Sequence, residues 1–363
     1  MMKKRILITT STYFQLIVAV HLKLTQFGQD DVDVIITQHS TGCEGVAERL
    51  RQTGIFRSVF YVPDRDGRDE KHVWEKVMRY VRTRVAPRHV LHQMVELNGD
   101  YDMFLFNNAS LLTHLLWRTL GRHTKCYRFE EGFSTYTRPV LEKSPARRWM
   151  IRGAFGDIER AIQGLYLFHP ELFRQKVDYP ILKMEPMCRD INQLRRVLND
   201  AFEYPSHGVD LSQEYIFMEE SFSASGVVMD DVELAQAVAD VVGRENLMVK
   251  LHPRSTGEAF MASGLSISKA SSVPWELVMM NQDLTGKKLL TITSGSVLAG
   301  TLYFSQPVEA YLLFRCVNGI PPMLDAAYLK YLEDLSAQTE RLHIPEHREE
   351  FLHELRKRIQ RKN

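Results

Sequence analysis

Residues 5–37 read RILITTSTYFQLIVAVHLKLTQFGQDDVDVIIT, and this stretch decides the fold class. Arg5 to Thr10 is a β-branched, apolar run that predicts a buried strand, and a polar break follows at Ser11-Thr12. Apolar residues then recur with helical spacing from Tyr13 to Leu24, before a second strand candidate at Val32 to Thr37. A strand, a helix and a strand in this order predict a βαβ unit with parallel strands.

The same alternation recurs along the chain and predicts an α/β protein. Further strand candidates are Val59 to Val62, Met103 to Phe106, Lys125 to Phe129, Glu214 to Met218, Leu247 to Leu251, Leu289 to Thr293 and Val308 to Leu313. Helix candidates include Ser110 to Leu120, Asp230 to Val242, Ser296 to Phe304 and Pro345 to Lys362. Such alternation is typical of mostly parallel sheets that helices cover on both faces.

The length of 363 residues favours two domains of about 150 to 200 residues each. Residues 141–210 are irregular, rich in Arg and punctuated by Pro, and we interpret them as helical pieces that connect two sheets. We place the boundary near Pro205. Residues 1–205 would form a Rossmann-like acceptor-side domain with this helical connector, and residues 206–363 a Rossmann-like donor-binding domain with a terminal helix. Two such domains facing a central cleft define the GT-B architecture.

The composition excludes several classes of protein. The charges nearly cancel, with 46 Lys and Arg against 45 Asp and Glu, so no global attraction to nucleic acid is expected. The four cysteines lie far apart, which indicates neither a zinc site nor a disulfide framework and suits a reducing cytoplasm. The N-terminus lacks the pattern of a secretory signal, and no run approaches the roughly 18 apolar residues of a spanning helix. We therefore expect a cytoplasmic protein, soluble or peripherally attached.

Two adjacent carboxylates, Glu130 and Glu131, follow the strand candidate that ends at Phe129, and Gly132 then lets the backbone turn sharply. Open α/β sheets bind ligands at the carboxyl ends of their strands, so this position favours chemistry. Mutual repulsion favours a proton on one of the two groups, which suits a general base. Side chains alternate along an extended strand, and we favour Glu131 as the residue that faces the ligand. Two surface acids on a solvated loop are the alternative.

The second motif is His252-Pro253-Arg254, which follows the strand candidate that ends at Leu251. Pro253 fixes the turn, Arg254 offers a charged fork for a phosphate, and His252 could stabilise or protonate a departing phosphate. A turn histidine bonded to nearby backbone is the alternative. Another His-Pro pair, His169-Pro170, follows what we interpret as a helical piece and lacks Arg, so we expect a structural role for it.

Polar residues at three further positions are candidates for binding a nucleotide. Ser294-Gly295-Ser296 separates a strand candidate from a helix candidate, where free amides and hydroxyls would cradle a phosphate, although simple helix capping explains the same residues. Glu276 lies at a helix start and could accept hydrogen bonds from ribose hydroxyls, although an acid there also stabilises the helix. Thr10 and Ser11 supply hydroxyls at the end of the first strand.

Metal and dinucleotide sites have little support. Asp31 and Asp33, like Asp64 and Asp66, spell the acid-x-acid string of metal-dependent transferases. The first string enters a strand and the second lies in a charged turn, so we expect no metal site. Neither the glycine-rich dinucleotide motif nor the P-loop string is present.

The order of the Glu-Glu-Gly, His-Pro and Ser-rich motifs on two Rossmann-like halves resembles that of bacterial sialyltransferases. The chain is most similar to the lipooligosaccharide sialyltransferases of glycosyltransferase family 52, with the capsular polysialyltransferases as relatives. The matching stretches are Ile8 to Leu16, Phe129 to Gly132, His252 to Arg254, Pro274 to Leu277 and Thr291 to Leu298. The lipooligosaccharide enzymes often show Asp where this chain has Glu130 and Glu131, which leaves the identity of the base open between the two.

The resemblance implies a metal-independent, inverting GT-B enzyme without a cofactor. It would move sialic acid from CMP-sialic acid to a glycan hydroxyl, usually on a terminal galactose. Glu131 or Glu130 would be the base, and His252 would assist the departure of CMP. Glu276 would bind the cytidine ribose, Ser294 and Ser296 would hold the phosphate, and Arg254 or the loop with Thr10 and Ser11 would meet the donor carboxylate.

Other functions stay open at this point. The donor could instead be CMP-Kdo or a UDP-sugar, or the chain could be a non-catalytic protein that binds a nucleotide or a glycan. For a surface glycan such as lipooligosaccharide or capsule, we expect attachment near the inner membrane through Arg147, Arg148, Arg152 and the C-terminal helix, although that helix suits a packed terminal element better. The sequence also allows a homodimer.

Overall fold

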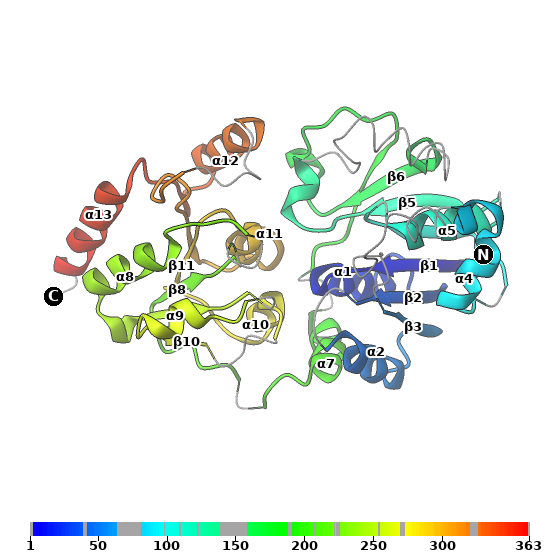
Figure 1. Ribbon diagram of the computed structural model, residues 1–363, viewed down its shortest axis with the longest axis horizontal. Coiled ribbons are helices and arrows are strands. Elements are labelled where there is room, and N and C mark those ends of the chain that lie inside the picture. Colours follow the sequence, from blue (N-terminus) through cyan, green and yellow to red (C-terminus); the bar gives the residue numbers. More distant parts are fainter. Residues whose placement is uncertain are drawn as a thin grey trace. The chain divides into compact units, whose positions relative to one another are not determined.

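The computed structural model describes residues 3–38, 42–63, 81–97, 99–108, 110–121, 123–137, 158–187, 191–206, 208–220, 222, 226–252, 255–268, 273–319 and 326–361. Contacts between residues divide the chain into two compact units, Met1–Glu203 and Tyr204–Asn363 (Figure 1). Each unit has its own parallel sheet and its own helices, so the expected α/β class is confirmed.

The sheet of the first unit has seven strands in the order β3-β2-β1-β4-β5-β6-β7, and its neighbouring strands pair in parallel. The strands are β1 (Arg5–Thr10), β2 (Asp31–Thr37), β3 (Ser58–Val62), β4 (Met103–Phe106), β5 (Lys125–Phe129), β6 (Ile162–Leu167) and β7 (Ile181–Lys183). Strand order reverses between β1 and β4, and sheets of this kind bind ligands at the carboxyl ends of the strands beside such a switch point.

The helices of the first unit are α1 (Tyr13–Leu24), α2 (Cys43–Gln52), α4 (Pro87–Met94), α5 (Leu111–Thr119) and α7 (Ile191–Phe202). Polar side chains cap the first turns of two of these helices, α1 and α5. The Thr12 hydroxyl accepts a hydrogen bond from the Gln15 amide at 3.2 Å, and the Ser110 hydroxyl accepts one from the Thr113 amide at 3.2 Å. The helix α7 packs on α1 and α2, whereas α5 packs on α4. Fully buried Leu7, Phe104 and Leu115 lie in the core of this unit.

The strands β6 and β7 correct the expectation of helical connecting pieces in one part of residues 141–210, whereas α7 in the same region is helical as expected. Both strands extend the first sheet, and short 3₁₀ turns at Ile158–Ala161 and Pro170–Leu172 lie beside them. Gly164 interrupts the apolar run of β6 and weakens its strand signal. A Cβ at this glycine would lie 3.2 Å from side-chain atoms of Tyr127 and Leu182, so its absence permits close packing between neighbouring strands. Residues 138–157 lie outside the described residues.

The sheet of the second unit has six strands in the order β10-β9-β8-β11-β12-β13, and its neighbouring strands are parallel as well. The strands are β8 (Tyr215–Met218), β9 (Leu247–Lys250), β10 (Ser266–Ile267), β11 (Lys288–Thr291), β12 (Glu309–Leu312) and β13 (Leu342–His343). Here the order reverses between β8 and β11, which puts the second switch point at the residues that follow Met218 and Thr291.

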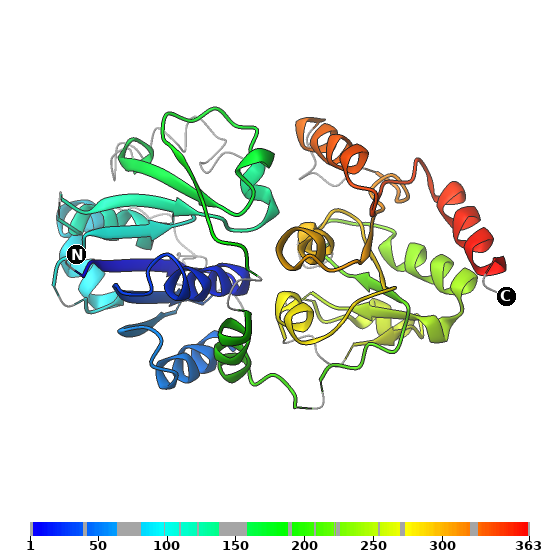
Figure 2. The same cartoon turned by 180° about the vertical axis from the view of Figure 1, so that it is seen from behind.

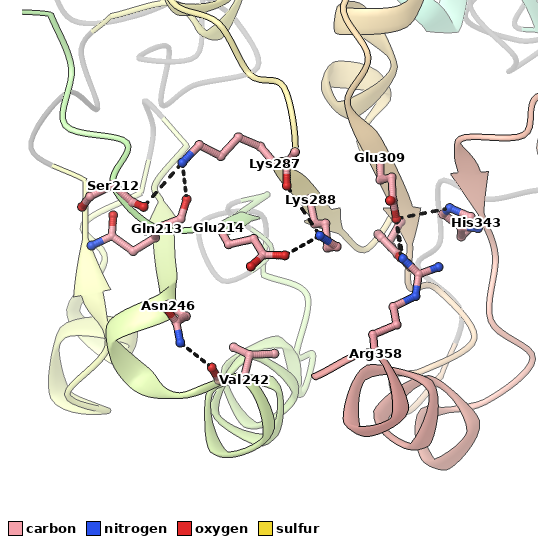
Figure 3. A network of polar contacts seen from close by, with 12 residues as sticks. Ser212, Gln213, Glu214, Val242, Asn246, Lys287, Lys288, Glu309, His343 and Arg358 are labelled. Atoms are coloured by element: carbon pink, nitrogen blue, oxygen red, sulfur yellow. Dashed lines mark hydrogen bonds and ion pairs between the residues drawn. The ribbon is translucent and has the colours of Figure 1, made fainter. Parts of the chain in front are cut away.

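The second unit carries the helices α8 (Asp231–Val242), α9 (Glu258–Ala262), α10 (Trp275–Asn281), α11 (Ala299–Phe304), α12 (Ala326–Gln338) and α13 (Arg348–Gln360). In Figures 1 and 2 the terminal helix α13, in red, runs beside α8, and the two helices are in contact. Phe351 and Leu355 of α13 are buried. Figure 3 shows Arg358 of α13 donating a hydrogen bond of 2.6 Å to Glu309, the first residue of β12.

The terminal helix is therefore a packed element of the second unit, which is the role that we favoured over lipid binding. Its apolar side chains are used for packing, because Phe351 and Leu355 lie against the unit. Arg147, Arg148 and Arg152 lie outside the described residues. Within the described part of the chain, no helix combines the length and apolar character needed to cross a membrane.

Candidate functional site

Glu130 lies directly after β5 and is fully buried. Its carboxylate accepts a hydrogen bond of 2.6 Å from the Tyr136 hydroxyl and one of 2.9 Å from the Phe168 amide. Its own amide donates to the Tyr166 carbonyl at 3.0 Å. Glu130 thus ties the end of β5 to the residues after β6 and to the 3₁₀ turn Phe133–Tyr136.

Glu131 is only partly buried, so it is the more accessible residue of this pair. Its amide donates a hydrogen bond of 3.0 Å to the Thr135 hydroxyl. The next residue, Gly132, has a φ of 131°, a backbone conformation that favours glycine. This glycine turns the chain away from the strand immediately after Glu131.

Arg128 puts a positive charge close to the glutamates. It is 1% exposed, and among the described residues no group accepts a hydrogen bond from its Nε or Nη2 atom. Burial lowers the pKa of Arg128, whereas Tyr179 and the carboxylate of Glu131 act in the opposite direction. The guanidinium and the Glu131 carboxylate therefore attract each other in the interior of the first unit.

The structure separates the roles of Thr10 and Ser11 at the end of β1. Thr10 is buried, and its hydroxyl donates to the Ile35 carbonyl at 3.3 Å, so it belongs to the sheet rather than to its surface. The partly exposed Ser11 donates from its amide at 2.7 Å and from its hydroxyl at 3.0 Å to Gln15 Oε1. Asn108 donates to the Ser11 hydroxyl at 3.0 Å. These polar groups join the ends of β1 and β4 at the first switch point.

His169 follows β6, so our reading of the preceding residues as a helical piece is wrong. Its Nδ1 lies 2.9 Å from Glu171 Oε1, and its amide donates to the Tyr136 hydroxyl at 3.2 Å. The residue thus takes part in the network around Glu130, which agrees with the structural role that we expected.

His252 follows β9 by two residues and is partly buried. Its amide donates a hydrogen bond of 2.8 Å to the carboxylate of Glu219, and its carbonyl accepts one of 2.9 Å from the Ser255 amide. Glu219 follows the neighbouring strand β8 and is 6% exposed. Pro253 and Arg254, the other two members of this motif, lie outside the described residues.

Glu220 holds the loop that follows β11, and the sequence analysis did not single it out. Its carboxylate accepts hydrogen bonds from the Thr291 hydroxyl at 2.6 Å, from the Thr293 amide at 2.5 Å and from the Ser294 amide at 3.0 Å. The Thr293 hydroxyl donates to the second carboxylate oxygen. Four donors on one carboxylate fix this loop against the end of β8.

The serine loop corrects one part of the predicted anion cradle. The amides of Thr293 and Ser294 are bonded to Glu220, and the Ser296 amide donates to the Ser294 hydroxyl at 3.3 Å. Ser294 therefore caps the 3₁₀ turn Gly295–Leu298, which leads into α11. The hydroxyls of Ser294 and Ser296 lie 2.8 Å apart on partly exposed residues. Two of the three amides in Ser294-Gly295-Ser296 are thus occupied within the protein, and the two hydroxyls are the side-chain groups that this loop offers to a ligand.

Lys250 and Glu276 form a second pair of charges in this unit. Lys250 is the last residue of β9 and is 6% exposed, and burial lowers its pKa to about 8 against the attraction of Glu276. Glu276 lies in the first turn of α10. Burial outweighs its own backbone amide and the charge of Lys250, so the pKa of Glu276 lies above its ordinary value. A carboxyl group has an oxygen that accepts hydrogen bonds in either protonation state, and this is what a ribose diol requires.

The acidic strings that we weighed as metal sites have other surroundings. Asp33 accepts a hydrogen bond of 2.7 Å from the Tyr101 hydroxyl and two from Arg57. Asp31 pairs with Lys3 at 2.6 Å. Asp64 and Asp66 lie outside the described residues. Among the described residues, no three His, Cys, Asp or Glu side chains gather as they would around a metal ion.

Comparisons with known proteins bear on the fold. No family model and no curated protein matches the chain. Among solved structures, TcCGT1 in complex with UDP has 12% identity over 95% of this chain and 86% of its own, with a TM-score of 0.50. UDP-GlcNAc 2-epimerase from Neisseria meningitidis bound to UDP-GlcNAc has 10% identity over 98% and 91%, with a TM-score of 0.48. MurG from Acinetobacter baumannii has 12% identity over 99% and 90%, with a TM-score of 0.44.

At such identities the likeness concerns the fold alone. The match to TcCGT1 and the two parallel sheets together confirm the GT-B fold class that the alternation of strands and helices predicted.

Proposed function

We propose that the protein is a sialyltransferase that moves sialic acid from CMP-sialic acid to a hydroxyl of a bacterial surface glycan. The acceptor would be a terminal galactose, and the reaction would invert the anomeric centre without a metal. The observation that carries the proposal is the switch point of the second unit. There, His252 and the hydroxyls of Ser294 and Ser296 follow β9 and β11, on either side of the glutamates after β8. The order of motifs that resembles bacterial sialyltransferases supports the same function.

In this mechanism Glu131 takes the proton. A carboxylate that accepts the proton of an acceptor hydroxyl raises the nucleophilicity of its oxygen during attack. Glu131 suits this task better than Glu130, because Glu130 is fully buried and its carboxylate is bonded to Tyr136 and Phe168. The buried cation Arg128 interacts with this carboxylate and adds a positive charge beside it.

The groups of the second unit would receive the leaving phosphate. The bond from the acceptor oxygen to the anomeric carbon forms as the bond from that carbon to the CMP phosphate oxygen breaks. The bonding electron pair leaves with CMP, and the acceptor proton ends on Glu131. His252 and the hydroxyls of Ser294 and Ser296 would stabilise the charge on the phosphate. Glu276 would accept hydrogen bonds from the ribose hydroxyls.

A transferase that uses a UDP-sugar is the second candidate, because TcCGT1, which shares the fold, is a complex with UDP. The occupied amides of the serine loop favour a CMP donor instead. Since Thr293 and Ser294 donate their amides to Glu220, fewer donors remain for the additional charge of a diphosphate. A single phosphate needs fewer partners.

The decisive experiment incubates the protein with CMP-sialic acid and a panel of galactosides. We expect free CMP and a sialylated product of inverted configuration, identified by mass and linkage analysis, with full activity in excess chelator. Release of UDP from a UDP-sugar without any release of CMP would replace the proposed donor. Binding of CMP without turnover on any acceptor would indicate a nucleotide-binding protein, and loss of activity in chelator would overturn the metal-independent mechanism.

We also propose that the protein acts in the cytoplasm, with peripheral attachment to the inner membrane. Cys43, Cys126 and Cys316 are buried free thiols, which suits a reducing compartment. The exposed basic residues at the end of α13 would supply the attraction to anionic lipid. Washing membranes with salt tests the attachment, because a protein that never pellets with membranes contradicts it.

A further inference from the structure

The two glutamates that follow β8 contact the two loops that carry the proposed leaving-group residues. We propose that Glu219 and Glu220 are positioning residues, with Glu219 fixing the backbone of His252 and Glu220 fixing the serine loop. This inference rests on the proposed function, because it assigns both loops to the departing phosphate. Neither glutamate needs to touch the substrate in this role.

The topology explains why one dipeptide can serve both loops. The strand β8 lies between β9 and β11, so its carboxyl end has a loop on either side. Glu219 contacts the loop after β9 through the 2.8 Å bond from the His252 amide. Glu220 contacts the loop after β11 through Thr291, Thr293 and Ser294. Successive side chains of an extended segment point in opposite directions. Glu219 and Glu220 therefore contact different loops.

The contacts are specific enough to define a matched substitution. In Glu220, Oε1 accepts from the Thr291 hydroxyl and from two amides, so this position must remain an oxygen. Within the described ranges, Oε2 accepts a hydrogen bond from the Thr293 hydroxyl alone, and a hydroxyl can accept as well as donate. Glu220→Gln therefore keeps the whole set of contacts and removes the charge, whereas Glu220→Ala removes the contacts as well.

The first measurement needs no nucleotide. Hydrogen–deuterium exchange is followed in a peptide that covers residues 289–298 in the wild type, Glu220→Ala and Glu220→Gln. We expect faster exchange at the Thr293 and Ser294 amides in the alanine variant only, since it alone loses their acceptor. Unchanged exchange in Glu220→Ala would overturn the inference and leave the proposed function intact.

The second measurement asks whether the loop matters for the nucleotide. We expect Glu220→Ala to weaken CMP binding and to raise the KM for the donor by about tenfold, with a smaller change in kcat. Glu220→Gln should bind CMP at least as tightly as the wild type, because it keeps the geometry and removes a negative charge near a phosphate. Glu219→Ala should instead lower kcat by about tenfold, through His252, with the donor KM nearly unchanged.

A general loss of stability would not raise KM in Glu220→Ala and lower kcat in Glu219→Ala. Nor would Glu220→Gln then restore the binding of CMP. If the exchange of the loop rises in Glu220→Ala while the affinity for CMP stays the same, the positioning role is wrong. If the wild type binds no nucleotide, the proposed function fails together with this role, and the exchange data then show whether Glu220 is a purely structural contact. Should Glu220→Ala not fold, Glu220→Asp provides the same comparison, because the shorter side chain draws the acceptor away from the Thr293 and Ser294 amides.

Discussion

Two pairs of adjacent glutamates follow strands of the two sheets, and the structure surrounds them differently. In the first unit, Glu130 is buried among donors from the protein, whereas Glu131 is partly exposed beside a glycine turn. In the second unit, Glu219 and Glu220 both accept hydrogen bonds from the loops on either side of β8. A pair of acids after a strand thus marks the carboxyl end of that strand. The hydrogen-bond donors around each carboxylate determine whether it has a structural or a chemical role.

The difference follows from what lies beside each strand end. After β5 the chain turns at Gly132 and returns through the 3₁₀ turn Phe133–Tyr136, which supplies one donor to Glu130, and the Phe168 amide after β6 supplies another. After β8 the donors come from the segments that end or follow β9 and β11, and Glu220 accepts hydrogen bonds from four of them. The oxygens of Glu220 are thus already engaged by groups of the protein, which leaves little room for a substrate hydroxyl to approach them. Of these four glutamates, Glu131 is the one that the described residues show both partly exposed and attracted to a buried cation, Arg128.

The largest effect that we predict is on turnover. Glu131→Gln should lower kcat by about 10² to 10⁴ while CMP binding stays near the wild-type value, because an amide cannot accept the proton of the acceptor hydroxyl. Initial rates of CMP release and calorimetric titration with CMP measure the two quantities. Glu258→Gln, a change of the same kind on the exposed residue that begins α9, is the control and should leave both unchanged. Full turnover by Glu131→Gln would remove this residue from the mechanism.

The next effect is on stability and separates Glu130 from its neighbour. Glu130→Ala should lower the free energy of unfolding by about 3 kcal/mol, because the buried Tyr136 hydroxyl and Phe168 amide lose their acceptor. Tyr136→Phe removes one of the two bonds to Glu130 and also the acceptor of the His169 amide, and it should cost about 2 kcal/mol. Thermal melting measures both variants. A Glu130→Ala variant with wild-type stability, retained CMP binding and abolished turnover would make Glu130 the base and reverse the comparison.

The sequence predicts the strands that carry long apolar runs. Arg5–Thr10 and Met103–Phe106 have the predicted bounds, because burial on both faces of a parallel sheet leaves a continuous apolar signal. Lys125–Phe129 has the predicted bounds as well, although Lys125 and Arg128 interrupt its apolar residues. The strands β10 and β13 have only two residues each, which is too short for any periodicity. The strand β6 was missed because Gly164 interrupts its pattern. The formation of a short or interrupted strand depends on pairing with neighbouring strands more than on its own residues.

The site was predicted in part for the same reason. His252, Ser294 and Glu131 follow strong strand signals and were found from position. Glu219 and Glu220 also follow an apolar run, Tyr215–Met218, and this signal could have found them. The sequence does not reveal which residues donate hydrogen bonds to these two carboxylates. The donors lie 33 residues away for Glu219 and 71 to 74 residues away for Glu220. Hydrogen bonds over such separations depend on strand order, which a local pattern does not specify.

The smallest effect that we predict is on the pH dependence of stability. It arises from Asp231, whose ionisation is sensitive to the charge of Glu219. Burial raises the pKa of Asp231 from its ordinary value of 3.8 to about 6, and the carboxylate of Glu219 adds to the rise. Because the folded chain then holds the proton more tightly than the unfolded chain, stability is lost as the pH rises from about 4 to about 6. Above this window Asp231→Asn should stabilise the protein by about 1 kcal/mol, whereas at pH 3.5 it should have no effect.

In a Glu219→Gln background the gain from Asp231→Asn at pH 7 should shrink, because one of the charges that opposes ionisation of Asp231 is gone. Melting temperatures of the two single variants and the double variant at pH 3.5 and pH 7 provide the cycle. Asp240→Asn, an exposed change near the other end of α8, is the control. A gain that is the same at both pH values would reflect packing rather than charge. A gain that Glu219→Gln leaves unchanged would mean that Glu219 contributes geometry alone, and the contrast between the two glutamate pairs would then lie entirely in their hydrogen bonds.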